Sequence, residues 1–250
     1  MSRNFELLNQ MGKSQVLLTQ EVPPAPTMPA PDMFVSTPAL EIDGMAREEI
    51  TKLVHRTFLL AGAESPRRVL FTGTESGNGT TWMCAHAGEI LASQVGRTVC
   101  VVDCNLRRPT LHEQFKMQNH NGLSDALRAD GPVRQYARQM RRNLWIMSCG
   151  ADCETATDLL TSDRMRMRLT ELANEFDYLL LDVASLNASN DGVVLGNLTD
   201  GAIIVLKAHS TRRDSSREAI QSLQAANVRV LGAVLNQRTF PIPEKIYKRI

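Results

Sequence analysis

Short apolar runs alternate with stretches of helical periodicity along most of this 250-residue chain. Runs that are apolar at nearly every position are typical of strands buried on both faces, which occur in parallel sheets covered by helices. The sequence therefore predicts an α/β fold, a three-layer αβα domain built around a mainly parallel sheet. The expected strands are residues 67–74, 97–103, 143–148, 177–183, 201–207 and 228–236, and the expected helices are residues 45–61, 81–95, 164–176 and 215–226.

The pattern divides the chain into three parts. Prolines crowd residues 22–38, and proline disfavours both helix interiors and sheet ladders. We therefore expect a disordered tail over residues 1–44, one domain over residues 45–240, and a short basic and apolar tail over residues 241–250.

The composition argues against two classes of partner and location. Lys and Arg number 28 and Asp and Glu 27, so the formal net charge of +1 gives no electrostatic reason to expect nucleic acid as a partner. No apolar run approaches the roughly 20 residues needed to span a bilayer. The N-terminal sequence also has no continuous apolar segment of the kind found in secretory signals. A cytoplasmic location is expected.

The chain contains five cysteines, which are Cys84, Cys100, Cys104, Cys149 and Cys153. An odd number in a long chain without a secretory signal favours free thiols. Two pairs are spaced four apart, but zinc sites more often combine such pairs with nearby histidines on turns. We therefore expect free thiols and no metal at the cysteines.

The turn between the first expected core strand and the helix that follows reads FTGTESGNGTT. The phosphate-binding pattern at such a place is G-x4-G-K-[ST], in which lysine reaches the phosphates and the hydroxyl binds Mg²⁺. With Gly79 as the second glycine, Thr74 occupies the first position. Thr80 then occupies the lysine position and Thr81 the hydroxyl position, while Gly77 and Gly79 let the backbone approach a phosphate. Without its lysine, this turn taken alone is equally compatible with an ordinary strand-to-helix connection.

Several segments outside the loop resemble motifs of the bacterial tyrosine kinases (BY-kinases). Residues 99–115 read VCVVDCNLRRPTLHEQF and are similar to the family's D-x-D-L-R-R-P segment. Residues 121–127, NGLSDAL, resemble the segment that follows it. Residues 176–183 resemble the Walker B strand, and residues 230–238 resemble the last strand. The resemblance covers roughly residues 45–240.

The resemblance implies a P-loop NTPase-like domain that works in the synthesis and export of capsule or exopolysaccharide. It implies a membrane polysaccharide co-polymerase as the partner, a peripheral position at the inner membrane through that partner, and a homo-oligomer. It also implies a site for ATP or ADP with Mg²⁺. The implied nucleotide site consists of Thr74, Gly77, Gly79, Thr80, Thr81, Asp103 and Asp182, of which Thr81, Asp103 and Asp182 would hold the Mg²⁺.

Several positions depart from the family pattern. Thr80 replaces the loop lysine, and Asn105 replaces the second acid of D-x-D. Residues 183–185 replace T-P-P, and the tyrosine-rich C-terminal tail is reduced to Tyr247. Removing one charge-stabilising group commonly slows a reaction by about 100- to 1000-fold, and asparagine cannot accept the proton of a tyrosine hydroxyl.

These departures favour weak or absent nucleotide binding and a non-catalytic or weakly active protein, with no catalytic residue assigned. Two alternatives stay open at this point. One is an active tyrosine kinase or ATPase with an unusual loop, and the other is a relative of the partitioning and positioning ATPases, whose early signature lysine Thr74 and Glu75 do not supply.

Two segments are candidate docking surfaces. Residues 49–56 partly match a family helix motif, E-x-x-R-x-x-R, that contacts a neighbouring subunit, and residues 242–250 combine isoleucines at helical spacing with basic residues. An ordinary solvated helix face and an ordinary packed terminus are the respective alternatives. A solvated face is also expected for the basic clusters, which are Arg138, Arg141, Arg142, Arg164, Arg166 and Arg168.

Overall fold

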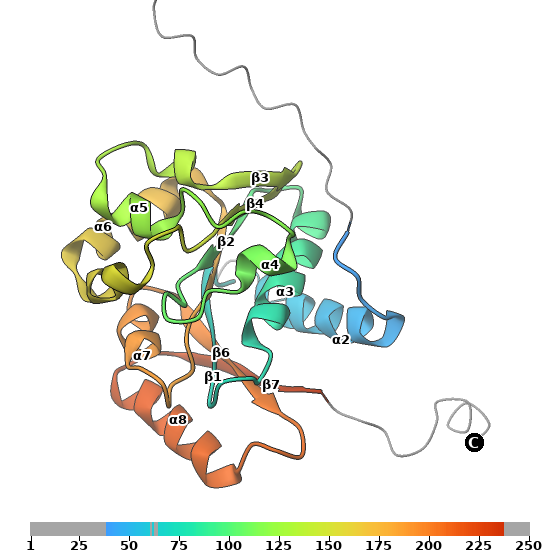
Figure 1. Cartoon of the computed structure of the whole chain (residues 1–250). Coiled ribbons are helices and arrows are strands. Elements are labelled where there is room, and N and C mark those ends of the chain that lie inside the picture. Colours follow the sequence, from blue (N-terminus) through green and yellow to red (C-terminus); the bar gives the residue numbers. More distant parts are fainter. Residues whose placement is uncertain (1–38, 61, 63–64, 238–250) are drawn as a thin grey trace, which may run out of the picture. The chain divides into compact units, whose positions relative to one another are not determined.

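The computed structural model describes residues 39–60, 62 and 65–237, which form a seven-stranded sheet flanked by helices (Figure 1). The strands follow the order β3-β4-β2-β5-β1-β6-β7 across the sheet. Their bounds are Arg68–Gly73 for β1, Val99–Asp103 for β2, Arg138–Arg141 for β3, Leu144–Met147 for β4, Tyr178–Asp182 for β5, Gly201–Lys207 for β6 and Val230–Asn236 for β7.

The strands pair in parallel throughout, except that β3 is antiparallel to β4. Strand β1 lies inside the sheet between β5 and β6, and Leu70 is in register with Leu181 on one side and Ala202 on the other. The interior strands are buried at nearly every position. A strand covered on both faces has no solvated side, and this explains the continuous apolar runs in the sequence.

Helices cover both faces of the sheet and enclose two apolar cores (Figure 1). The helices α2, α3 and α4 pack on one face, and α5, α6, α7 and α8 pack on the other. Gly88 allows α3 to lie close to the sheet, because a Cβ there would overlap the side chain of Val101. The bounds are Gly44–Val54 for α2, Thr80–Val95 for α3, Leu111–Gln114 for α4, Leu123–Arg128 for α5, Asp163–Glu175 for α6, Asp191–Gly196 for α7 and Arg213–Ala225 for α8, with a π-helical turn at His55–Leu59 and 3₁₀ turns at Val133–Tyr136 and Glu154–Thr161.

The predicted fold class is confirmed. Each expected strand and helix is present within a few residues of its expected bounds, and the expected helix over residues 45–61 consists of α2 followed by the π-helical turn. Strand β3 and the short helices α4, α5 and α7 were not predicted. Residues 1–38 of the expected N-terminal tail and all of the expected C-terminal tail, residues 241–250, lie outside the described residues. In the part of the chain that the structure describes, no helix is both long enough and apolar enough to cross a membrane.

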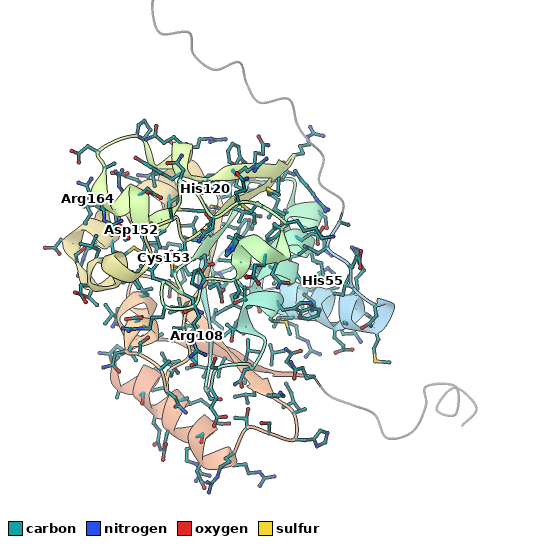
Figure 2. The ribbon with its side chains drawn as sticks, in the orientation of Figure 1. His55, Arg108, His120, Asp152, Cys153 and Arg164 are labelled. Carbon is teal, nitrogen blue, oxygen red and sulfur yellow. A yellow bond between two sulfur atoms is a disulfide. The ribbon has the colours of Figure 1, made fainter. Side chains whose placement is uncertain are left out.

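The expectation of a solvated face at the second basic cluster was wrong for Arg168. Its guanidinium is buried and donates to the carbonyl oxygens of Ala126, Ala129 and Gly131. Arg164 (labelled in Figure 2) is partly covered and forms an ion pair with Asp130 at 2.7 Å. These arginines connect α6 to the end of α5 and the residues that follow it. The contacts depend on how the two helices pack, and the sequence alone does not predict them.

Candidate functional site

Three neighbouring strands end together at the carboxyl edge of the sheet. Asp103 at the end of β2 is in register with Asp182 at the end of β5, and Asp182 is in register with Phe71 of β1. The chain leaving β1 forms the glycine-rich loop and enters α3 at Thr80. The carboxyl edge of a parallel sheet is the usual location of a ligand site in α/β proteins. It brings together all the sequence-predicted site residues, which are Thr74, Gly77, Gly79, Thr80, Thr81, Asp103 and Asp182.

The glycine-rich loop requires glycine at its last position. Gly79 caps α3 with a φ of 81°, in the left-handed region that favours glycine. A Cβ on Gly79 would also overlap the side-chain amide of Asn236. Gly77 has a φ of 85° as well, but a Cβ there would meet nothing within 4 Å. The loop is therefore tightly packed at Gly79 and open at Gly77.

Asn78 ties the loop to the rest of the sheet. Its buried side-chain amide donates to Thr74 Oγ1 and to the carbonyl oxygen of Val205, both at 2.9 Å. Asn236, at the end of β7, donates in turn to the carbonyl oxygen of Asn78 at 2.9 Å. Neither asparagine was identified from the sequence, although Asn78 lies between the two loop glycines and Asn236 ends an apolar run.

Thr80 is the first residue of α3, where the phosphate-loop pattern has its lysine. Its hydroxyl lies against the start of the loop, since a Cβ on Gly73 would come within 2.9 Å of Thr80 Oγ1. The next residue, Thr81, is half-buried and its hydroxyl contacts Thr110 Oγ1 at 3.2 Å. No ammonium group extends from the lysine position, and the charges that face α3 from the strand ends are the carboxylates of Asp103 and Asp182.

Burial governs the protonation of these two carboxylates. It raises the pKa of Asp103 to about 7, although the backbone N–H groups of Asn105 and Leu111 donate to its two oxygens and oppose the rise. The pKa of Asp182 lies well above its usual range because of burial and the neighbouring Asp103. The hydroxyl of Thr81 opposes this rise, but neither oxygen of Asp182 has a hydrogen-bond partner of good geometry.

A buried carboxylate without a partner is costly unless a cation or a donor joins it. The side chains present fit Mg²⁺, which prefers carboxylate and hydroxyl oxygens together with water and phosphate. Neither oxygen of Asp182 has a hydrogen-bond partner of good geometry, Asp103 accepts only backbone N–H groups, and Thr81 supplies a hydroxyl beside them. Bound Mg²⁺ would neutralise the charge of this pair and of phosphate oxygens near it.

Asn105 belongs to the turn that follows β2 and helps to shape it. Its backbone N–H donates to Asp103 Oδ1 at 3.1 Å, and its own carbonyl accepts the N–H of Arg108 at 3.2 Å. Arg107 is paired with Asp191 at 3.6 Å rather than with Asp103 or Asp182. Asp103 accepts the N–H of Leu111 at 3.1 Å and so stabilises the start of α4.

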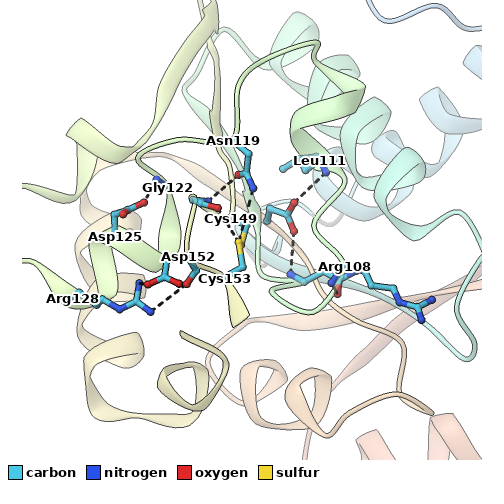
Figure 3. Close-up of a disulfide and its surroundings, with 12 residues drawn as sticks. Arg108, Leu111, Asn119, Gly122, Asp125, Arg128, Cys149, Asp152 and Cys153 are labelled. Carbon is cyan, nitrogen blue, oxygen red and sulfur yellow. Dashed lines mark hydrogen bonds and ion pairs between the residues drawn. A yellow bond between two sulfur atoms is a disulfide. The ribbon is translucent and has the colours of Figure 1, made fainter. Parts of the chain in front are cut away.

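The expectation of five free thiols was wrong for one pair. Cys149 and Cys153 form a disulfide in the loop after β4, with their Cα atoms 6.1 Å apart (Figure 3). Gly150, with a φ of 97°, turns the chain between them. The other three cysteines are free and buried. Among the described residues, no three side chains of His, Cys, Asp or Glu gather in a way that could hold a metal.

The two candidate docking surfaces are only partly visible. On α2, Glu49 accepts from Lys52 at 2.8 Å, and Lys52 is also 2.9 Å from Glu48, so these charges pair within their own helix. Arg56 lies in the π-helical turn and is exposed. Residues 242–250, including Tyr247, lie outside the described residues.

No family model matches the chain. The chain is 26% identical over 171 residues to the tyrosine-protein kinase YwqD of Bacillus subtilis, which covers 68% of this chain and 72% of that protein. It is 24% identical over 186 residues to the putative tyrosine-protein kinase CapB of Staphylococcus aureus, covering 74% and 81%. It is 24% identical over 203 residues to the tyrosine-protein kinase etk of Escherichia coli, covering 80% of this chain and 28% of that longer protein.

Solved structures share the fold. The chimerical protein CapA2B2 superposes with a TM-score of 0.72 at 20% identity, covering 77% of this chain and 85% of that one. The kinase domain of the Escherichia coli tyrosine kinase ETK superposes with a TM-score of 0.68 at 20% identity, covering 82% and 85%. A Mycobacterium smegmatis cobyrinic acid a,c-diamide synthase with bound ADP and magnesium superposes with a TM-score of 0.53 at 15% identity, covering 67% and 71%. By sequence and by fold, this chain is a relative of the bacterial tyrosine kinases.

Proposed function

We propose that this chain is a BY-kinase-like regulatory or assembly protein of exopolysaccharide biosynthesis and export, with little or no kinase activity of its own. The observation that carries the proposal is Thr80 at the start of α3, where the family has its lysine. The short side chain lies against Gly73, so no positive charge reaches the space above the loop from this position. Phosphoryl transfer depends on positioning and on neutralising charge at the γ-phosphate, and both suffer without that lysine.

The turn after β2 supports the same proposal. In the family the second acid of D-x-D is thought to lie near the acceptor hydroxyl, and here that position is Asn105. Its amide cannot act as a base, and its oxygen lies 3.4 Å from the N–H of Arg108 within its own turn. The fold around the altered site is intact. Asn78 and Asn236 hold the glycine-rich loop in place, and the interior strands of the sheet are paired on both sides. A chain of this kind can serve by binding a partner.

The natural partner would be the cytoplasmic face of a membrane polysaccharide co-polymerase. Residues 49–56 and residues 242–250 are the surfaces we assign to this contact, or to contact between copies of the chain. Docking through either surface would hold the protein at the periphery of the inner membrane.

A genetic experiment tests the role. Deleting the gene should reduce or alter the secreted polysaccharide, whereas Thr80→Ala and Asp182→Asn should leave its amount and chain length close to wild type. Charge reversal at Lys52 and Arg56, or truncation after Arg238, should reproduce the deletion. Normal polysaccharide in the deletion strain would contradict the proposal, as would an Asp182→Asn protein that accumulates normally yet behaves like the deletion.

A biochemical experiment tests the absence of kinase activity. Purified protein incubated with Mg²⁺ and ATP labelled at the γ-phosphate should acquire no phosphotyrosine, on Tyr247 or elsewhere. An active relative assayed in parallel serves as the positive control. Robust autophosphorylation that disappears in Asp182→Asn would overturn the non-catalytic proposal in favour of its alternative.

That alternative, an active kinase or ATPase with an unusual loop, is favoured by one observation. Asp182 keeps two buried oxygens without partners beside Asp103 and Thr81, an arrangement with no evident structural purpose. Measured ATP hydrolysis by the wild-type protein that is lost in Asp182→Asn would support it. A partitioning or positioning ATPase is less well supported, because a plasmid partition protein from Borrelia burgdorferi superposes with a lower TM-score, 0.52, than the kinase domains do.

A further inference from the structure

The disulfide lies in the loop after β4, and this loop accepts hydrogen bonds from the first turn of α5. Strand β4 ends at Met147, and residues 148–153 follow it. The carbonyl oxygen of Ser148 accepts the N–H of Leu123 at 2.8 Å, and that of Cys149 accepts the N–H of Ser124 at 2.7 Å. The start of α5 is therefore hydrogen-bonded to the same backbone that the disulfide closes.

The fit between this loop and α5 leaves no spare room. A Cβ on Gly122 would overlap the backbone at Ser148 and Gly150, and a Cβ on Gly150 would overlap the side chains of Ser124 and Asp125. Asn119 adds a further tie, since its Oδ1 accepts the N–H of Gly150 at 2.9 Å (Figure 3). A change in the conformation of residues 148–153 must therefore alter the packing and hydrogen bonding of the segment from Asn119 to Asp125.

Among the five cysteines, only Cys153 is at all exposed. Cys84, Cys100 and Cys104 are completely buried, and burial raises the pKa of each thiol. A thiol reacts as its thiolate, so these three are inert toward exchange in the folded protein. Cys149 is also fully buried, but its sulfur is joined to that of Cys153, which is 7% exposed and follows the exposed Ala151 and Asp152 in the same loop (Figure 2). Cys153 is therefore the sulfur that a reagent can reach.

We propose that Cys149 and Cys153 form a reversible redox pair that sets how firmly α5 is held against the end of β4. Oxidation joins the two sulfurs, each thiol losing its proton, while a low-molecular-weight disulfide such as oxidised glutathione accepts the two electrons and leaves as two thiols. In the reverse direction a thiolate attacks Sγ of Cys153, and Cys149 leaves as a thiolate and takes up a proton. A second thiol then cleaves the mixed disulfide, which releases Cys153 and the oxidised reagent.

The disulfide restricts the conformations of the loop that it closes. The bond constrains a loop of four intervening peptide links, and reduction returns conformational freedom to it. The amides of Leu123 and Ser124 then depend on a looser acceptor backbone. Local opening of α5 becomes more frequent, while β6, which is separated from β4 by β2, β5 and β1 in the sheet, keeps its stability.

Thiol counting tests the chemical step. Protein equilibrated with oxidised glutathione, then denatured and alkylated with N-ethylmaleimide, should carry three labels by intact mass. The same protein equilibrated with excess reduced glutathione should carry five. Five labels under both conditions would overturn the proposal, and so would peptide mapping that finds oxidation at Cys84, Cys100 or Cys104 instead.

Hydrogen exchange tests the conformational step. We expect peptides covering residues 119–128 to exchange roughly tenfold faster in the reduced protein than in the oxidised protein, with no change in peptides covering β6. The double variant Cys149→Ser with Cys153→Ser should exchange at the fast rate and ignore the redox buffer. A wild-type protein that forms the disulfide but exchanges equally in both states would overturn the assigned role of the pair.

Discussion

Asp103 and Asp182 occupy opposed positions on the neighbouring parallel strands β2 and β5, and both carboxylates are buried. Because both carboxylates are buried and lie on neighbouring strands, ionising both at once costs a large amount of free energy. The pair therefore couples the stability of the domain to pH and to cations, and this coupling can be measured independently of any activity.

The first prediction concerns pH. Both folded-state pKa values are raised above the unfolded values, so the carboxyl groups stabilise the fold below about pH 4 and lose this contribution as the pH rises through about 7. The free energy of unfolding should fall over that interval in Mg²⁺-free buffer. Asp182→Asn should flatten the dependence and be more stable than wild type at pH 8, because the amide carries no charge that burial would penalise.

Urea denaturation at pH 5, 7 and 8 measures this effect. Asp177→Asn is the matched control, because the hydrogen bonds from Thr98 hold the pKa of Asp177 below its usual value despite its partial burial. That variant should be less stable than wild type at pH 8. An Asp182→Asn protein that is also less stable than wild type at pH 8 would show that the ionised carboxylate has a partner.

The second prediction concerns Mg²⁺. Millimolar Mg²⁺ should raise the melting temperature of the wild-type protein at pH 8, because a cation that binds only the folded state stabilises it. The increase should be smaller in Asp182→Asn and at pH 5, where the pair binds protons instead. Differential scanning fluorimetry with and without EDTA is sufficient. An equal increase in wild type and Asp182→Asn would indicate that Mg²⁺ binds elsewhere.

The third prediction concerns the missing lysine. Thr80→Lys should strengthen the binding of Mg²⁺ and ATP, since a charge-assisted contact to phosphate is typically worth about 1.5–3 kcal/mol, or roughly tenfold to 100-fold in affinity. Isothermal titration calorimetry compares this variant with wild type and with Thr80→Ala, which should gain nothing. Micromolar binding by the wild type that Thr80→Lys leaves unchanged would show that the assigned register of the loop is wrong.

The fourth prediction concerns Asn78. Asn78→Ala removes two hydrogen bonds from a buried site and leaves the carbonyl oxygen of Val205 with one donor fewer, which should lower the free energy of unfolding by about 1–3 kcal/mol. Asn236→Ala also removes two hydrogen bonds, but its side chain is only half-buried and one of the two partners is the exposed N–H of Gln237, so it should have a smaller effect. Urea denaturation of the two variants measures both losses. A larger loss of unfolding free energy in Asn236→Ala than in Asn78→Ala would mean that Asn236 of β7 contributes more to holding the loop than Asn78 does.

The fifth prediction separates backbone strain from steric overlap at the loop glycines. Gly77→Ala should cost about 1–2 kcal/mol for an alanine in the left-handed region, because a Cβ there meets nothing. Gly79→Ala should cost more, because its Cβ also overlaps Asn236. A double-mutant cycle should show that Asn236→Ala relieves the excess at Gly79 and has no effect at Gly77.

The strands and their order illustrate what local pattern can and cannot predict. The run GAIIVLK predicts a strand over residues 201–207, and β6 has these bounds. Strand β3 was not predicted, because RQMR has no apolar pattern and its extended form depends on pairing with β4. A short segment with one methionine among three polar residues acquires its extended conformation from pairing with its neighbour rather than from its own preferences.

The site divides in the same way. The spacing of the loop and the strand ends predicts that Thr81, Asp103 and Asp182 lie at one edge, because parallel strands present their carboxyl ends together. Their burial, and the absence of partners at Asp182, depends on the side chains and helices that cover them. The contact between Asn78 and Asn236 joins residues 158 positions apart, and no local pattern contains it.

The sequence by itself determined the alternation of buried strands and amphipathic helices, the loop with threonine in place of lysine, and the kinship with tyrosine kinases. These are matters of residue type and of spacing along the chain. The tertiary structure decided which strands are neighbours, which carboxylates are deprived of water, and which cysteines meet. The spacing of Cys149 and Cys153 fits a helix or a turn equally well, and only the left-handed turn at Gly150, packed against α5, brings their sulfurs together.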